Sequence, residues 1–271
     1  MIDFSLRISI FICLLCLLII WQWKAPRTPL KQWSWRCFHN LSLLLLGALC
    51  VRLIQPLLLS IVAFINSGEG LFSVFQLHYW GQILLGIVAL DALIYWQHRL
   101  FHRIPLLWRL HQVHHSDQAL DVSSALRFHP IEILLSLCIK AIAILALGIP
   151  VEAVLAFDIL LNACAMFNHT NVRLPQYAES AIKLFIVTPD MHRIHHSVRF
   201  SETNSNYGFC LSLWDRIFHS YTECAKGGDD HIRIGLPGQK NRLEASIKSL
   251  LLMPFKPPST VTQKTSQQNK T

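Results

Sequence analysis

Long apolar segments constrain the fold of this chain more than any other feature. A helix needs about 20 apolar residues, within a range of about 17–25, to cross the hydrocarbon core of a bilayer. Apolar residues make up 52% of the 271 residues and charged residues only 15%, against roughly 25% charged in a soluble domain. The sequence therefore predicts an all-α, multi-pass membrane protein with about four to five spans. The candidate spans run from about Phe4 to Trp23, Leu41 to Ile65, Tyr79 to Gln97, Ile131 to Ile149 and Val151 to Phe167.

The connecting segments divide the chain into three parts. We expect membrane anchors in residues 1–78, a histidine-rich domain in residues 79–225 and a polar, basic tail in residues 226–271, the last fifteen of them disordered. The first segment lacks a basic start and a small-residue cleavage site, so it is expected to be an anchor and not a signal peptide. The residues Gly148 to Pro150 predict a tight hairpin, and the short apolar patch Ala181 to Val187 is expected to lie at the membrane interface.

The distribution of basic residues predicts the orientation. The connection from Lys24 to Asn40 and the histidine-rich regions are basic, whereas the connection from Asn66 to His78 has no lysine or arginine. By the positive-inside rule, the histidine-rich regions face the cytoplasm and the N-terminus faces outward. The net charge of +8 then reflects cytoplasmic loops, and we expect no nucleic-acid partner. The eight cysteines form no regularly spaced framework, which fits a reducing, cytosol-facing environment.

Three clusters of histidine indicate a metal site. On a helix, positions i, i+3 and i+4 share one face, so each cluster can aim two or three imidazoles at one point. Neutral imidazole binds iron, zinc, copper and nickel, and eight imidazoles exceed what one ion holds but suit two. Chance produces such a pattern far less than once among 271 residues with 14 histidines. The clusters are HxxxH (His98, His102), HxxHH (His111, His114, His115) and a second HxxHH (His192, His195, His196).

Four further residues are weaker candidates. His129 and His169 flank the last two spans at the same membrane face and could complete a ligand set. Asp91 precedes His98 by seven residues, and Asp158 precedes His169 by eleven, so each acid lies near the helix face of a histidine. A carboxylate that accepts a hydrogen bond from the second ring nitrogen orients a ligating histidine. The alternative is a structural contact with a neighbouring helix, which is the favoured interpretation for Asp158.

These motifs resemble the fatty acid hydroxylase superfamily, also called the sterol desaturase family, in its bacterial membrane-bound branch. The resemblance covers roughly Asp91 to Tyr221 and rests on DALIYWQHRLFH, LWRLHQVHHS, ALRFHPIE, FNHTN, TPDMHRIHHS and NSNYGFCLSLWDRIF. It implies a helical membrane fold whose cytosolic helical cap carries a di-iron centre, and a catalytic domain in residues 79–225. It assigns catalytic and ligand roles to the eight histidines of the clusters, and His129 and His169 match further recurring histidines. In the segment WDRIFHSY, His219 occupies the position where the family usually has glycine.

The resemblance implies an oxidoreductase that uses two iron ions and dioxygen to hydroxylate or desaturate a fatty acyl, sterol or related lipid. Zinc could replace iron in isolated protein. A separate protein is expected to donate electrons, because no flavin, haem or nicotinamide motif is visible. We expect an integral protein of the bacterial inner membrane with the active site facing the cytoplasm. Two alternatives remain. A dinuclear zinc lipid hydrolase usually has carboxylate ligands, which the clusters lack, and a metal transporter or metal-binding membrane protein would hold ligands near the bilayer midplane.

Overall fold

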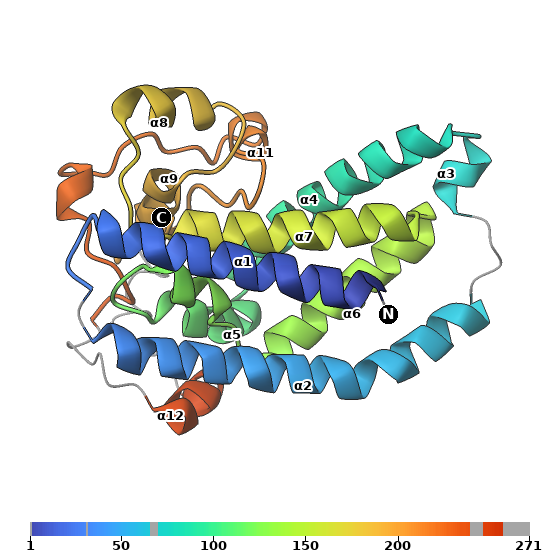
Figure 1. Cartoon of the computed structure of the whole chain (residues 1–271), viewed down its shortest axis with the longest axis horizontal. Helices are drawn as coiled ribbons and strands as arrows, with labels where there is room; N and C mark the ends of the chain where they lie inside the picture. Colours follow the sequence, from blue (N-terminus) through green and yellow to red (C-terminus); the bar gives the residue numbers. More distant parts are fainter. Residues whose placement is uncertain (1, 31, 66–69, 239–245, 257–271) are drawn as a thin grey trace, which may run out of the picture.

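The chain is almost entirely helical in this computed structural model, which describes residues 2–30, 32–65, 70–238 and 246–256 (Figure 1). Within these ranges no β-strand forms, and the β-type pairing is limited to two isolated bridges, Ile186–Leu211 and Ser197–Ile234. Five helices are long and apolar enough to cross a membrane, so the predicted all-α, multi-pass class is confirmed. They are α1 (Ile2–Lys24), α2 (Trp33–Ile65), α4 (Tyr79–Arg103), α6 (Pro130–Leu147) and α7 (Val151–His169).

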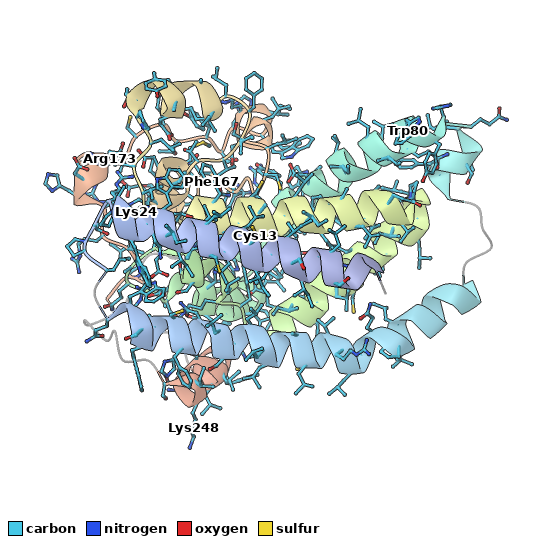
Figure 2. All side chains as sticks on the ribbon, viewed as in Figure 1. Cys13, Lys24, Trp80, Phe167, Arg173 and Lys248 are labelled. Carbon is cyan, nitrogen blue, oxygen red and sulfur yellow. The ribbon has the colours of Figure 1, made fainter. Side chains whose placement is uncertain are left out.

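The shorter helices gather mainly in the half of the bundle where α1 ends and α2 begins (left in Figure 1). We call residues 104–129 and 170–238 the cap. Lys24 and Arg173 lie at this end of the molecule, and Trp80 lies at the other (Figure 2). The short elements are α3 (Leu71–Val74), α5 (Pro105–His115), η1 (Val122–Leu126), α8 (Gln176–Ile182), α9 (Pro189–His195), α10 (Phe200–Thr203), α11 (Leu213–Ile217), η2 (Asp229–His231), α12 (Ile247–Leu252) and η3 (Met253–Phe255).

Two helices extend beyond their predicted limits. Helix α4 continues to Arg103, so the HRLFH motif lies on the last turns of a span. It ends there because Ile104, which precedes Pro105, is extended, and Pro105 begins α5. Helix α2 begins at Trp33 and not near Leu41. Its first turns are helical because the polar side chains of Arg36 and Asn40 are buried and find partners in the cap, so Arg36 does not lie in a solvated loop.

The hairpin at Gly148 to Pro150 forms as predicted. Gly148 ends α6 with a φ of 69°, in the left-handed region that glycine adopts without steric cost. A Cβ atom at Gly148 would lie 2.9 Å from the Cα atom of Gly70, so two backbones also touch here. Helices α4 and α7 pack against each other through the buried side chains of Leu90, Ile94 and Phe157. This contact sets the ends of both helices side by side beneath the cap.

Part of the region expected to be a tail is folded. Helix α12 places Leu250, which is completely buried, against Leu43 and Val113. Arg109 on α5 donates to the carbonyl oxygen of Pro254 at 2.5 Å. Residues 257–271, which are expected to be disordered, lie outside the described residues. Positions 66–69 of the connection before α4 also lie outside them. The division into parts 1–78, 79–225 and 226–271 stays a prediction.

Candidate metal centre

Nine histidines converge in two groups. The nitrogen atoms that each group can offer a metal all lie within 4.8 Å of one another. Eight of the nine residues are buried, and the ninth, His102, is partly exposed but has a buried Nε2 atom. The five-histidine group consists of His98, His102, His111, His115 and His195, and the four-histidine group consists of His114, His169, His192 and His196.

The two groups adjoin each other because the HxxHH clusters are shared between them. On α5, His111 and His115 belong to the five-histidine group, whereas His114 belongs to the other. The rings of His115 and His196 stack with their centroids 4.2 Å apart, across the boundary between the groups. Each HxxHH motif therefore aims two of its imidazoles at one group and the third at the other group. Consecutive residues of a helix differ by about 100° in direction, so adjacent histidines of one motif point toward different groups.

Backbone carbonyls orient two rings of the five-histidine group. The Nδ1 atom of His98 lies 2.8 Å from the carbonyl oxygen of Tyr207, and the Nδ1 atom of His195 lies 2.8 Å from that of Ser205. A carbonyl oxygen can only accept, so each Nδ1 carries the hydrogen and donates. The Nε2 atom of each ring then keeps its lone pair and faces the centre of the group.

The inward nitrogen atoms of this group have no partner. The Nε2 atoms of His98, His102, His111 and His195 are buried without a hydrogen-bond partner, and so are both ring nitrogens of His115. Buried polar atoms are nearly always hydrogen-bonded, so five such imidazoles around one point call for a ligand. A transition-metal ion satisfies this donor set, since imidazole nitrogen is a preferred ligand of iron, zinc and copper.

The four-histidine group shows the spacing of metal ligands directly. The Nε2 atoms of His169 and His192 are 2.9 Å apart, and those of His192 and His196 are 3.1 Å apart. Metal–nitrogen bonds of about 2.0–2.1 Å place neighbouring ligands about 2.9 Å apart at a right angle and about 3.3 Å apart at a tetrahedral angle. The residues present therefore fit a metal ion in each group, and among the described residues neither group includes a carboxylate.

Burial keeps the cap histidines neutral, which is the form that binds metal. Burial is the main cause that lowers the pKa of His192 to about 3, and the charges of His98 and His111 contribute to the same shift. Burial likewise lowers the pKa of His115, with His196 as the next cause. The pKa values of His114, His195 and His196 are lowered well below the usual range for the same first reason.

The structure does not bring His129 to either group. His129 caps the N-terminus of α6, where its Nδ1 atom accepts from the N–H of Ile131 at 3.2 Å. Its Nε2 atom lies 3.2 Å from the carbonyl oxygen of Leu251. Both ring nitrogens thus have partners outside the metal centre, because Pro130 begins α6 and leaves His129 at the cap position. His169, by contrast, lies within the four-histidine group.

Asp91 does not contact His98, because the Nδ1 atom of that ring is taken by Tyr207. The carboxylate of Asp91 accepts instead from the Trp214 side chain at 2.8 Å and from the backbone N–H groups of Cys210 and Leu211. Asp91 therefore holds the segment that follows Tyr207. Asp158 lies far from both groups and pairs with Arg7 at 2.9 Å and Lys140 at 3.0 Å, which is a contact between helices.

Glu132 is a site residue that the sequence reasoning missed. Its Oε1 atom lies 2.6 Å from the Nδ1 atom of His111, and both side chains are buried. A carboxylate at this position orients the ring and increases its basicity as a ligand. The available signal was an acid in the first turn of an apolar span, three residues after His129 in the motif ALRFHPIE.

Asp215 builds the turn of the WDRIFHSY motif. It accepts from the backbone N–H groups of Tyr207 at 2.7 Å and Gly208 at 2.8 Å and from the Ser220 hydroxyl. Burial raises the pKa of Asp215 to about 6, although these donors oppose the shift. His219, which stands where the resemblance predicts glycine, has a φ of 54° and so adopts the conformation that glycine favours. The turn forms despite the substitution.

Comparison with known proteins agrees with this geometry. The family model described as fatty acid hydroxylase matches residues 83–220. An ornithine lipid hydroxylase, OlsE, of Rhizobium tropici is 32% identical over 151 residues, which cover 53% of this chain and 45% of the relative. The human alkylglycerol monooxygenase is 33% identical over 143 residues, which cover 52% of this chain and 30% of the relative.

A very-long-chain aldehyde decarbonylase, GL1-9, of Oryza sativa subsp. indica is 28% identical over 142 residues, which cover 52% of this chain and 54% of the relative. The matched part of this chain thus spans about half or less of the length of these relatives. No solved structure matches the chain. The family model covers half of the sequence and includes every residue of both histidine groups, and the chain belongs to the fatty acid hydroxylase family.

Proposed function

We propose that this chain is a membrane-bound di-iron oxygenase that hydroxylates or desaturates a lipid C–H bond. The observation that carries the proposal is the pair of adjoining groups of buried imidazoles. The curated relatives are named as lipid hydroxylases and monooxygenases, which supports oxidation over other lipid chemistry. Bound iron would supply the binding and activation of dioxygen, and a separate protein would supply the electrons.

The roles of the chain itself follow from its geometry. The five-histidine and four-histidine groups would each hold one iron ion through neutral imidazole nitrogen atoms. Carbonyl oxygens and Glu132 hold the rings in place, so the ligands need little reorganisation on binding. Burial of the groups, between the cap and the ends of α4 and α7, limits the access of water to the reacting atoms.

The alternatives of the zinc lipid hydrolase and the metal transporter are not favoured. A dinuclear hydrolase usually includes carboxylate ligands, and neither group has one among the described residues. A transporter would hold its ligands near the bilayer midplane, whereas these histidines lie at the ends of α4 and α7 and in the cap.

Metal analysis combined with lipid analysis tests the proposal. Protein purified from membranes under reducing conditions should hold about two metal ions per chain. His111→Ala and His192→Ala should each lower that number, whereas His129→Ala should not. Lipids from a host that expresses the protein under labelled dioxygen should contain either label or a new double bond. A metal content near zero in active protein would refute the proposal, and hydrolysed but unoxidised lipid would favour the zinc hydrolase.

Reporter fusions test the proposed orientation in the inner membrane. A reporter after Glu223 in the cap should report cytoplasm, and one inserted at Gln76, next to α3, should report the opposite side. The charge asymmetry supports this orientation, and the cap and α3 lie at opposite ends of the bundle (Figure 1). Both reporters on one side would contradict it.

A further inference from the structure

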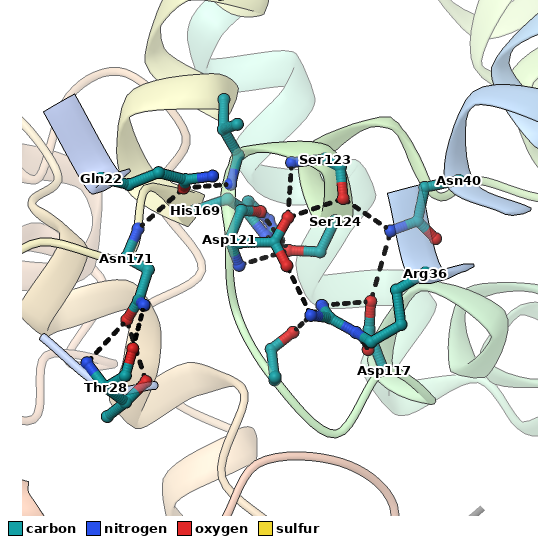
Figure 3. A network of polar contacts seen from close by, with 12 residues as sticks. Gln22, Thr28, Arg36, Asn40, Asp117, Asp121, Ser123, Ser124, His169 and Asn171 are labelled. Atoms are coloured by element: carbon teal, nitrogen blue, oxygen red, sulfur yellow. Dashed lines mark hydrogen bonds and ion pairs between the residues drawn. The ribbon is translucent and has the colours of Figure 1, made fainter. Parts of the chain in front are cut away.

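A buried polar network links the start of α2 to the cap (Figure 3). The Nε and Nη2 atoms of Arg36 donate to the two carboxylate oxygens of Asp117 at 2.7 and 2.8 Å. The Nη1 atom of Arg36 forms an ion pair with Asp121 at 2.6 Å. All three side chains are at least 96% buried. One guanidinium therefore fixes both ends of the segment between α5 and η1.

Asp121 also forms hydrogen bonds with the first residues of η1. The backbone N–H and the hydroxyl group of Ser123 donate to the Asp121 carboxylate at 2.9 and 2.6 Å. The hydroxyl group of Ser124 donates to the carbonyl oxygen of Asp121 at 2.6 Å. The carboxylate and the carbonyl oxygen of Asp121 thus hold Ser123 and Ser124 in one arrangement.

Ser124 in turn orients His169. The Oγ atom of Ser124 lies 2.8 Å from the Nδ1 atom of His169. A hydroxyl group has one hydrogen, and that of Ser124 is already given to Asp121, so Nδ1 of His169 must donate to Ser124. The Nε2 atom of His169 therefore keeps its lone pair, and it faces His192 in the four-histidine group.

A second path reaches His114. Its Nδ1 atom lies 3.3 Å from the carbonyl oxygen of Arg127, the residue that ends η1. The guanidinium of Arg127 is held by the side chains of Asn40 on α2 at 3.1 Å and Ser116 at 2.8 Å. The segment from Asp121 to Arg127 thus contacts two of the four histidines, and residues of α2 hold that segment at both of its ends.

Among the described residues, no comparable chain of hydrogen bonds connects the five-histidine group to α2. The Nδ1 atoms of His98, His195 and His111 have Tyr207, Ser205 and Glu132 as partners, all within the matched family segment 83–220. Arg36 and Asn40 lie outside that segment, in the region expected from the sequence to be only an anchor. The histidine rings of the two groups are therefore oriented by different parts of the chain.

We propose that Arg36 is a positioning residue for the four-histidine group, so that the N-terminal helices determine whether the second metal ion is held. The inference rests on the proposed function, since it presupposes one metal ion in each group. The planar fork of arginine matches three acceptors at once, which a lysine ammonium cannot do from the same place. Without the fork, Asp121 and Ser124 lose their fixed positions, and the Nδ1 atom of His169 loses its acceptor.

The test measures zinc and ferrous iron bound per chain, without any activity measurement. Full-length protein in detergent is loaded with either metal without oxygen and then titrated with a chelator. Arg36→Met and Arg36→Lys should retain about one ion where the wild type retains about two. Ser124→Ala, which removes only the hydroxyl group, should weaken the second ion by ~10–100-fold and leave the first unchanged. Arg52→Met is the matched control, because Arg52 is an exposed arginine on the same helix.

Double variants assign the lost ion to one group. Arg36→Met combined with His169→Ala should still hold about one ion, whereas Arg36→Met combined with His98→Ala should hold almost none, because independent sites lose their ions separately. Retention of two tightly held ions by both Arg36→Met and Ser124→Ala would overturn the inference. Equal loss of both ions in Ser124→Ala would also overturn it, because that result indicates a general structural role. A wild type that never binds two ions would instead refute the proposed function.

Discussion

Glu132 offers the sharpest test of how the five-histidine group is supported. Its Oε1 atom lies 2.6 Å from Nδ1 of His111, while its Oε2 atom is buried without a hydrogen-bond partner. Glu132→Gln can turn its oxygen toward His111 without breaking a second contact, so it removes the charge and keeps the hydrogen bond. Glu132→Ala removes both. The two variants therefore separate the effect of the charge from the effect of the contact.

The expected magnitudes follow from the burial and the short distance. A hydrogen bond to a charged group contributes about 1.5–3 kcal/mol, and one between neutral groups contributes about 0.5–1.5 kcal/mol. The difference, about 1–1.5 kcal/mol, corresponds to about a five- to twelvefold loss of metal affinity for Glu132→Gln, at about 1.4 kcal/mol per factor of ten. Glu132→Ala should lose about ten- to a hundredfold, as is typical when a ligating histidine loses its hydrogen-bond partner.

Competition with a chelator measures these affinities on protein loaded with zinc. Glu152→Gln is the control, because Glu152 is exposed at the opposite end of the bundle, at the start of α7. We expect the order wild type, Glu152→Gln, Glu132→Gln, Glu132→Ala, with the first two equal. An unchanged affinity in Glu132→Ala would refute the reasoning, because the buried contact to His111 would then contribute nothing to metal binding.

Three further predictions concern the rest of the molecule. Asp91→Asn should lower both the melting temperature and metal retention, because the three donors to Asp91 hold the segment after Tyr207. Asp158→Asn should lower only the melting temperature, because Asp158 contacts neighbouring helices. Equal loss of metal in the two variants would contradict this prediction. Gly148→Ala should destabilise the protein by at least about 1 kcal/mol, since φ is positive and Gly70 is close, while Gly81→Ala, with open space around it, should be neutral or stabilising in thermal unfolding. Asp215 has a pKa raised by burial to about 6, so its contribution to stability is fully present below about pH 4 and is lost as the pH rises through 6. The difference in unfolding free energy between the wild type and Asp215→Asn, measured on metal-free protein, should therefore be larger at pH 4 than at pH 7, and a larger difference at pH 7 would contradict the assignment.

The sequence by itself determined the class of fold and most members of the two histidine groups. Bilayer thickness requires apolar runs of a certain length, so composition alone reveals the spans. The eight histidines of the clusters could be chosen because their spacing repeats the turn of a helix, which is a local property. His169 was named as a candidate from the sequence, and the structure places it in the four-histidine group. Its ligation of metal, like that of the other eight, stays a prediction.

Only the tertiary structure decided how these residues are shared and supported. Spacing along one helix cannot tell which of His111, His114 and His115 turns toward which neighbour, because that depends on how α5 crosses α4 and α9. The partners of Asp91 and of Glu132 lie 119–123 and 21 residues away in sequence, so no local pattern reveals them. The start of α2 is the clearest case. Its polar residues are expected in a loop by composition, and they form helix because the cap satisfies them in the folded chain.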